Sequence, residues 1–279
     1  MFASTHNKKK QHVSGAVGNL YKRRWLVVYF IRRELARSYQ SSFLGFFWML
    51  LTPLLMVALY TLIFSEIIGL RFRVVEGDSS LNFGLYLYCG LIPFLTFAGS
   101  LSQSTNSIKG NANLVQKVVF PVEILPLSIT ITNFVTNTFG LGVLVAVLAV
   151  LERRLEWTLV LLPLLMIVQL IFTLGLSYLA AVVGTYLPDL RGTIQAITRA
   201  MFFVTPIIWP ADRVEGTNFE FIVAYNPLAV LVEAYRNLVL DGEIPASTPI
   251  LLFTLFSVVL FLVGFALFVR AKRQFADLI

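Results

Sequence analysis

The stretch Asn113-Leu-Val-Gln-Lys-Val-Val-Phe-Pro-Val-Glu-Ile-Leu-Pro126 decides the fold, because it separates two long apolar runs, Phe83–Ser104 and Ile124–Leu151. It contains two prolines, a lysine and a glutamate. Charged side chains are costly inside a bilayer, and prolines interrupt the helix that a lipid-embedded backbone needs. The stretch is therefore expected to lie at a membrane surface and to connect two membrane-spanning helices.

The composition is that of an integral membrane protein. Of the 279 residues, 57% are hydrophobic and 13% are charged, whereas about a quarter of the residues of a soluble domain are charged. As a helix, about 20 apolar residues cross the hydrocarbon core. The chain is therefore expected to be all-α with six membrane-spanning helices, at Phe43–Leu70, Phe83–Ser104, Ile124–Leu151, Trp157–Leu187, Thr193–Trp209 and Ile250–Val269.

The distribution of Lys and Arg predicts the orientation of these helices, since basic residues are enriched on the cytoplasmic side. With the N-terminus inside, sixteen of the 22 basic residues lie on the inner side and six on the outer side. Both termini and the Asn113–Pro126 stretch are then cytoplasmic. The net charge of +7 is explained by this orientation and does not indicate nucleic-acid binding.

Four parts are expected along the chain. Residues 1–18 are polar and predict a disordered cytoplasmic tail, and residues 19–38 predict an amphipathic helix on the inner membrane surface. Residues 43–270 form the transmembrane domain, and residues 271–279 a cytoplasmic C-terminus. One face of the 19–38 helix is expected to be apolar: Tyr21, Trp25, Val28, Ile31 and Leu35.

The apolar stretch Phe219–Leu240 is irregular, because Asn226-Pro227 breaks it and it bears Glu233 and Arg236. A charged residue at the centre of a span costs about 2.5–3.5 kcal/mol. A seventh full span is therefore disfavoured. Two re-entrant half-helices that dip in from the outer side between spans five and six fit the pattern better.

Motifs of catalysis and nucleotide binding are missing from the sequence. There is no G-x-x-x-x-G-K-[ST], G-x-G-x-x-G, H-E-x-x-H or G-x-S-x-G, so no catalytic residue and no metal site are expected. His6 and His12 lie in the polar tail, and Cys89 is expected to be a buried thiol. Energy for uphill transport would then have to come from another chain.

Six short motifs occur in order over about residues 20–270, and it is their order and spacing that is informative. They are Leu44–Pro53, Gly90–Phe94, Asn113–Pro126, Tyr186–Arg191, Phe203–Pro210 and Asn226–Leu228, the last followed by Tyr235-Arg236. In this arrangement the chain resembles type-2 ABC exporter permeases, of the branch that exports polysaccharides such as O-antigen, capsule or teichoic acid.

The resemblance implies a multi-pass permease of the bacterial cytoplasmic (inner) membrane that works as a homodimer in contact with membrane lipids. It would pair with two copies of a cytoplasmic ATPase, which hold the ATP and Mg²⁺, so this chain needs no cofactor. The substrate would be a lipid-linked polysaccharide. Contact with the ATPase is expected at Asn111, Asn113, Gln116, Lys117, Pro121 and Glu123. For Lys117 and Glu123, a solvated pair at the membrane edge is the alternative.

Three further groups of residues acquire expected roles. Arg32, Arg33 and Arg37 could bind the pyrophosphate of the lipid carrier, or they could only be attracted to anionic lipid. An external gate is expected at Asn226, Pro227, Glu233 and Arg236. Aromatic side chains could line the polymer channel or form an interfacial belt: Tyr39, Phe43, Phe46, Phe47, Trp48, Phe202, Phe203 and Trp209.

Two other functions compete with polysaccharide export. A type-2 ABC permease for a small hydrophobic drug or a lipid would share most of the features above. A membrane-embedded enzyme of glycan or lipid metabolism is disfavoured, because the sequence lacks catalytic motifs and an acidic cluster within its spans.

Overall fold

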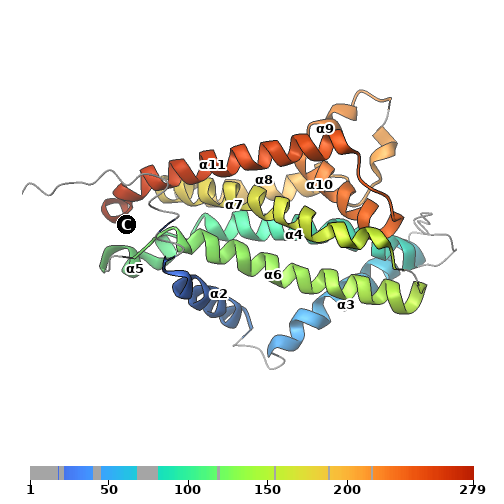
Figure 1. Cartoon of the computed structure of the whole chain (residues 1–279), viewed down its shortest axis with the longest axis horizontal. Coiled ribbons are helices and arrows are strands. Elements are labelled where there is room, and N and C mark those ends of the chain that lie inside the picture. Colours follow the sequence, from blue (N-terminus) through green and yellow to red (C-terminus); the bar gives the residue numbers. More distant parts are fainter. Residues whose placement is uncertain are drawn as a thin grey trace, which may run out of the picture.

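The computed structural model describes residues 18, 22–39, 45–67, 81–117, 120–153, 155–187, 189–214 and 216–279. Within these residues every regular element is a helix, which confirms the all-α prediction. The longer helices lie side by side along the long axis of the molecule (Figure 1). The expected tail and most of the loop after the first span lie outside the described residues.

The helices follow one another with short connections. They are α2 (Arg24–Tyr39), α3 (Trp48–Tyr60), α4 (Leu81–Ser104), α5 (Ala112–Lys117), α6 (Ile124–Val147), α7 (Leu162–Tyr186), α8 (Leu190–Val204), α9 (Glu220–Ala224), α10 (Pro227–Arg236) and α11 (Ser247–Leu278). Short 3₁₀ or π-helical turns flank or extend several of them: η1 (Gly45–Phe47), η2 (Thr61–Ile67), η3 (Lys109–Asn111), η4 (Leu148–Glu152), η5 (Trp157–Leu161), η6 (Ala211–Val214) and η7 (Asn237–Asp241).

Four helical segments of the described chain are long and apolar enough to cross a membrane: Phe83–Ser104, Ile124–Val150, Trp157–Tyr186 and Ser247–Phe275. They match four of the six predicted spans, so the chain is a membrane protein. The first predicted span contains a shorter apolar helix, Trp48–Ile63. The fifth corresponds to α8, whose 15 residues are roughly 22 Å long and so fall short of the hydrocarbon core.

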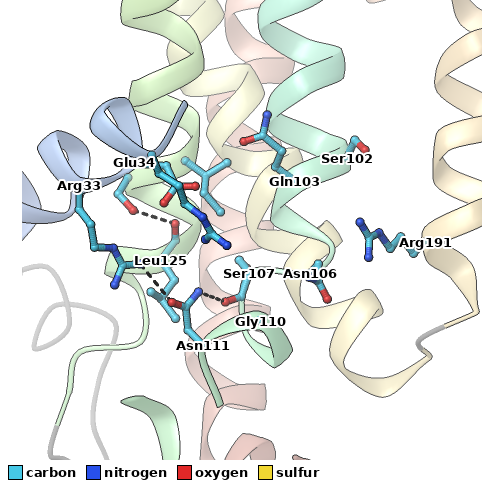
Figure 2. Close-up of a pocket in the computed structure, with 13 residues that line it drawn as sticks. Arg33, Glu34, Ser102, Gln103, Asn106, Ser107, Gly110, Asn111, Leu125 and Arg191 are labelled. Atoms are coloured by element: carbon cyan, nitrogen blue, oxygen red, sulfur yellow. Dashed lines mark hydrogen bonds between the residues drawn. The ribbon is translucent and has the colours of Figure 1, made fainter. Parts of the chain in front are cut away.

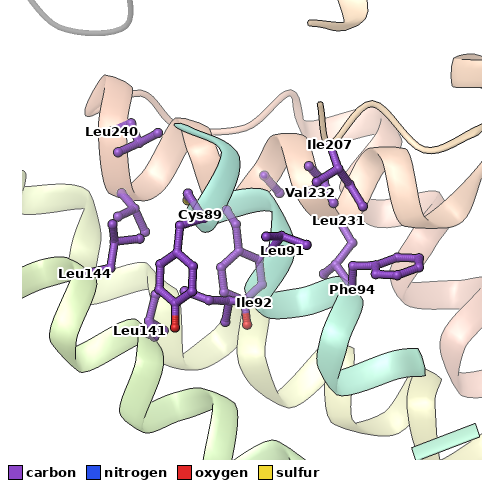
Figure 3. Packing of buried hydrophobic residues seen from close by; sticks show 14 of the residues in the cluster. Cys89, Leu91, Ile92, Phe94, Leu141, Leu144, Ile207, Leu231, Val232 and Leu240 are labelled. Carbon is purple, nitrogen blue, oxygen red and sulfur yellow. The ribbon is translucent and has the colours of Figure 1, made fainter. Parts of the chain in front are cut away.

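Helix α4 is the centre of the bundle. Of its span, 72% is buried inside the protein, compared with 44% or less for the other three candidate spans. Its side chains Cys89, Leu91 and Phe94 pack between α6 on one side and α10 with the preceding turn on the other (Figure 3). Cys89 is fully buried, as predicted.

Helices α7 and α11 pack closely because glycines face each other at their contact. A Cβ atom on Gly175 would lie 2.8 Å from the backbone nitrogen of Phe261 and 2.9 Å from the carbonyl carbon of Leu260. Gly264 of α11 faces the backbone of Gly175 in turn. Small residues allow such close approach of membrane helices, which associate mainly through packing.

The predicted break at Asn226-Pro227 separates α9 from α10 and is a well-formed helix start. The Asn226 side chain accepts a hydrogen bond of 3.0 Å from the backbone N–H of Leu228, and Pro227 occupies the first helical position. Both are preferred helix-start residues. Helices α9 and α10 lie at the end of the molecule opposite to α5 and the C-terminus (Figure 1). Helix α11 runs on to Leu278, through most of the expected C-terminal segment 271–279.

We predict that Gly175→Ala destabilises the protein by about 1–3 kcal/mol, because the new methyl group would meet the backbone of α11. Gly142→Ala is the matched control, since a Cβ added there would have nothing within 4 Å; its effect should stay within about 0.5 kcal/mol. Thermal unfolding of both variants in the same detergent measures the difference. Equal melting temperatures would contradict this role of Gly175.

Candidate functional site

A polar cavity of about 210 Å³ lies at the end of the molecule that holds α5 and the C-terminus. Helices α2, α4, α6 and α8 and the turn after α4 all contribute to it (Figure 2). Its lining residues are Arg33, Glu34, Arg37, Ser102, Gln103, Asn106, Ser107, Gly110, Asn111, Leu125, Ser128, Ile129 and Arg191. Three arginines and one glutamate make the cavity basic.

Two of the three arginines expected to bind phosphate line this cavity. Arg33 donates a hydrogen bond of 3.1 Å to Asn111 Oδ1, and Asn111 Nδ2 donates one of 2.9 Å to the carbonyl oxygen of Ser107 (Figure 2). Arg37 also lines the cavity, whereas Arg32 is exposed on α2 and is not among the described lining residues. Guanidinium groups held in this way suit a phosphate or carboxylate ligand.

Arg191 is a third arginine of this cavity, and the sequence alone gave it no expected role in binding. It comes from the start of α8 and faces the cavity from the side opposite to α2 (Figure 2). Its position in the motif Tyr186–Arg191 was the only available signal. More than 150 residues separate it from Arg33 and Arg37, and a one-dimensional pattern does not bring such distant residues together.

The stretch expected to contact an ATPase forms η3 and the short helix α5. Asn113 and Gln116 are exposed, while Asn111 and Pro121 are half-buried. Gln116 Nε2 donates a hydrogen bond to the backbone carbonyl of Ile279. The side chain of Lys117 lies outside the described residues. The exposed side of α5 thus offers polar groups at the surface of this end of the molecule.

Glu123 is placed differently from the other residues of this group, because it is only 2% exposed. Its carboxylate pairs with Lys272 of α11. The Tyr178 hydroxyl of α7 donates a hydrogen bond of 3.2 Å to the Glu123 carbonyl oxygen. Glu123 therefore fastens the end of the stretch to α7 and α11 and does not present its carboxylate at the surface.

Helix α2 is attached to the same stretch through aromatic packing. Phe30 is 4% exposed, and its ring centroid lies 5.1 Å from that of Phe120. The Arg33 guanidinium lies 4.2 Å from the centre of the Phe30 ring. Phe30 is not part of the expected apolar face of α2, whereas Trp25 and Val28, which are part of it, are exposed. Helix α2, the stretch from Asn111 to Glu123 that contains α5 (the α5 stretch) and the end of α11 thus form one junction.

Arg236, an expected gate residue, is buried at the opposite end of the molecule. It is 1% exposed, and its two terminal nitrogens donate hydrogen bonds of 2.7 Å and 2.8 Å to the carbonyl oxygens of Pro206 and Ile207. Its guanidinium lies 3.6 Å from the centre of the Tyr86 ring and 3.7 Å from the Glu233 carboxylate. One side chain thus joins α10 to α4 and to the turn after α8.

Further polar contacts hold the cluster around Arg236. Asn226 Nδ2 donates a hydrogen bond of 3.1 Å to Thr205 Oγ1. The Tyr235 hydroxyl donates to Gln169 Oε1, and Gln169 Nε2 donates one of 3.2 Å to the carbonyl oxygen of Pro93. Of the four expected gate residues, Asn226 and Arg236 are buried, and Pro227 and Glu233 are half-buried.

The aromatic residues expected in a channel are divided between two helices. Phe47 and Trp48 lie at the start of α3, where Phe47 is exposed. On α8, Phe203 is exposed, while the Phe202 ring packs 5.5 Å from that of Phe94. Trp209 Nε1 donates a hydrogen bond of 3.0 Å to the Phe203 carbonyl. Phe43 and the side chains of Tyr39 and Phe46 lie outside the described residues.

The described residues contain no cluster of three or more His, Cys, Asp and Glu side chains that could hold a metal ion.

Comparison with known proteins gives relatives that match nearly end to end. The chain is 29% identical to the O-antigen export system permease protein RfbA of Myxococcus xanthus over 262 residues, covering 94% of this chain and 98% of the relative. It is 30% identical to the RfbA protein of Klebsiella pneumoniae over 257 residues, covering 91% and 95%. The polysialic acid transport protein KpsM of Escherichia coli is 24% identical over 252 residues, covering 87% and 91%.

The model of one protein family, described as ABC-2 type transporter, matches residues 26–240. This range runs from α2 through the polar cavity and the α5 stretch to the cluster around Arg236. It contains the residues on which the expectations of coupling, lipid binding and gating rest. The chain therefore belongs to the ABC-2 type transporter family.

Proposed function

We propose that this chain is the membrane subunit of an ATP-driven exporter that moves a lipid-linked polysaccharide of the O-antigen type across the bacterial cytoplasmic membrane. The observation that carries the proposal is its end-to-end similarity to O-antigen export permeases, at 30% identity over 91% of the chain for one of them. Two copies of the chain would form the permease, and two copies of a cytoplasmic ATPase would drive it.

In this proposal the membrane is crossed six times. Helix α3 with the turns η1 and η2 supplies the described part of the first span, and α8 supplies the fifth. Helix α2 lies at the cytoplasmic surface, where exposed Trp25 and Val28 can contact lipid. Helices α9 and α10 enter from the outer side as two half-helices and form the external gate.

The basic cavity is the proposed binding site for the pyrophosphate of the lipid carrier. Arg33 and Arg37 point to it from the surface helix α2, and Arg191 adds a third guanidinium from α8. The cavity lies beside the helix that would rest on the membrane, so a lipid-borne phosphate could approach it laterally. Exposed Arg32 would contribute at longer range by attracting anionic headgroups.

The α5 stretch is the proposed contact with the ATPase, through the exposed Asn113 and Gln116 and through Lys117. A push on α5 would pass into the bundle along two routes. One runs through Phe120 and Phe30 to α2, and the other through Glu123 and Lys272 to α11.

The aromatic residues of α3 and α8 are the proposed lining of the polymer channel, where flat rings offer sugars geometry-tolerant apolar contact.

The substrate is tested by deleting the gene in its natural host. Because the proposed task is export of the finished or growing lipid-linked polymer, surface polysaccharide should be lost and the polymer should accumulate inside the cell. Electrophoresis and immunodetection of surface and intracellular glycan measure both effects. Unchanged surface polysaccharide combined with sensitivity to a hydrophobic drug would favour the alternative permease function.

Coupling is tested by reversing the charges of the buried pair. Glu123→Lys or Lys272→Glu alone would place two like charges in a buried site, which is expected to cost about 3–5 kcal/mol and to abolish export. The double variant restores opposite charges, so it should recover part of the lost stability and part of the lost export. Membrane content, ATP hydrolysis and export are measured in parallel.

Arg273→Glu is the matched control, because Arg273 is an exposed neighbour of Lys272 on the same helix. It should leave membrane content and export close to those of the parent. If the double variant is as inactive as the single variants although its membrane content is normal, the pair does not transmit coupling as proposed.

The external gate is tested with Arg236→Met, which removes the donors from two buried carbonyl groups. Each unsatisfied buried group costs about 1–3 kcal/mol, so the contacts of α10 with the turn after α8 should break more often. Hydrogen exchange should rise in residues 203–209 and 228–241 and stay unchanged near α5. Glu233→Gln, at a half-exposed partner 3.7 Å away, should change exchange much less. Equal exchange in both variants would contradict the gate assignment.

A further inference from the structure

Helix α8 carries a polar stripe along its length. Arg191, Gln195 and Arg199 follow one another at intervals of four residues, so their side chains lie on one face of the helix. Arg191 and Arg199 are exposed and Gln195 is half-buried. The stripe is therefore on the surface of the described chain and not in its core.

The Arg199 end of this stripe lies near the middle of the bundle along its length. Phe202 is one turn beyond Arg199, and its ring packs 5.5 Å from that of Phe94. Phe94 is close to the middle of α4, which runs from Leu81 to Ser104 and is a candidate membrane span. Measured along the axis of α8, Arg199 therefore lies about 4.5 Å from the contact between Phe202 and Phe94. This position is well inside the depth of the membrane.

An arginine at this depth is unfavourable if it faces lipid, by about 2.5–3.5 kcal/mol on insertion scales. Arg199 Nε donates a hydrogen bond of 3.3 Å to the backbone carbonyl of Gln195. In the described part of the chain no carboxylate forms an ion pair with Arg199. Its exposed guanidinium is therefore best satisfied by water or by an anion.

The stripe is continuous with the basic cavity. Arg191 at its lower end lines the cavity together with Ser102 of α4 (Figure 2). Gln195 Nε2 lies 3.5 Å from Ser102 Oγ, within hydrogen-bonding distance. A polar surface thus extends from the cavity at the cytoplasmic end along α8 to Arg199, over a distance of about 12 Å.

We infer that this face of α8 lines a water-filled path and that Arg199 gives the path a preference for anionic groups, phosphate or carboxylate, on the transported molecule. The identity of that molecule as a lipid-linked glycan rests on the proposed function. The aqueous face and its positive charge are argued from the residues of α8 and do not depend on which molecule is transported. The anion comes either from the pyrophosphate of the carrier or from acidic sugars of the polymer.

The aqueous face is tested by thiol labelling of the permease together with its ATPase in inside-out membrane vesicles. The native Cys89 is fully buried, so the parent chain should give a low background. Gln195→Cys should react with charged, water-soluble methanethiosulfonates. Leu262→Cys, on the exposed apolar face of α11, is the control and should not. If Gln195→Cys is as unreactive toward these reagents as Leu262→Cys, the inference is overturned.

The charge preference is tested with an anionic and a cationic methanethiosulfonate, each rate at Gln195→Cys being divided by that reagent's rate with a free thiol. The anionic reagent should be favoured severalfold, and Arg199→Gln should abolish this preference while Arg199→Lys retains it. A preference that survives Arg199→Gln would overturn the role of Arg199. Since no transport is needed, this result does not depend on the proposed substrate.

Export assays then identify the source of the anion. Neutral and uronate-containing glycans are presented on the same lipid carrier to the parent, to Arg199→Gln and to Arg199→Lys. A severalfold slower export of both glycans by Arg199→Gln assigns the preference to the carrier pyrophosphate. A loss confined to the acidic glycan assigns it to the polymer. Unchanged export of both glycans would overturn the role of Arg199 in transport.

Discussion

The buried ion pair between Glu123 and Lys272 is the contact on which the end of the structure that holds α5 depends. It joins the end of the α5 stretch to α11, which packs against α7 at the Gly175–Gly264 contact. Removing one partner of such a pair leaves an uncompensated buried charge, which costs far more than an exposed pair contributes. The segment that would meet the ATPase therefore cannot move without either moving α11 or breaking this pair.

A second charged residue organises the opposite end by a different means. Arg236 is satisfied by two backbone carbonyls and by the face of the Tyr86 ring, with one carboxylate at longer range. Carbonyl acceptors of this kind belong to a turn, so the geometry of residues 205–207 and the position of α10 depend on each other. The junction at α5 and the cluster around Arg236 are thus both held by buried charge, with apolar and glycine-mediated packing between them.

Hydropathy predicted the four long spans, because the cost of exposing backbone and charge to lipid leaves few alternatives to an apolar helix. The same physics identified Arg236 and the Asn226-Pro227 break, since charges and helix breakers stand out in an apolar run. Periodicity did not identify Phe30 on the buried face of α2, because its contact with Phe120 of the α5 stretch depends on tertiary structure. The Glu123–Lys272 pair joins residues 149 positions apart, and neither charge alone indicates its partner.

Helix α11 is the element that reaches from one end of the bundle to the other. Its 32 residues form a rod about 48 Å long, with Lys272 near one end and the neighbourhood of α10 at the other. A rigid rod acts as a lever, and a tilt of about 5° about one end displaces the other by roughly 4 Å over this length. The geometry of a single helix is therefore sufficient to turn a small rotation at the junction with α5 into a displacement the size of a side chain at the opposite end of the bundle.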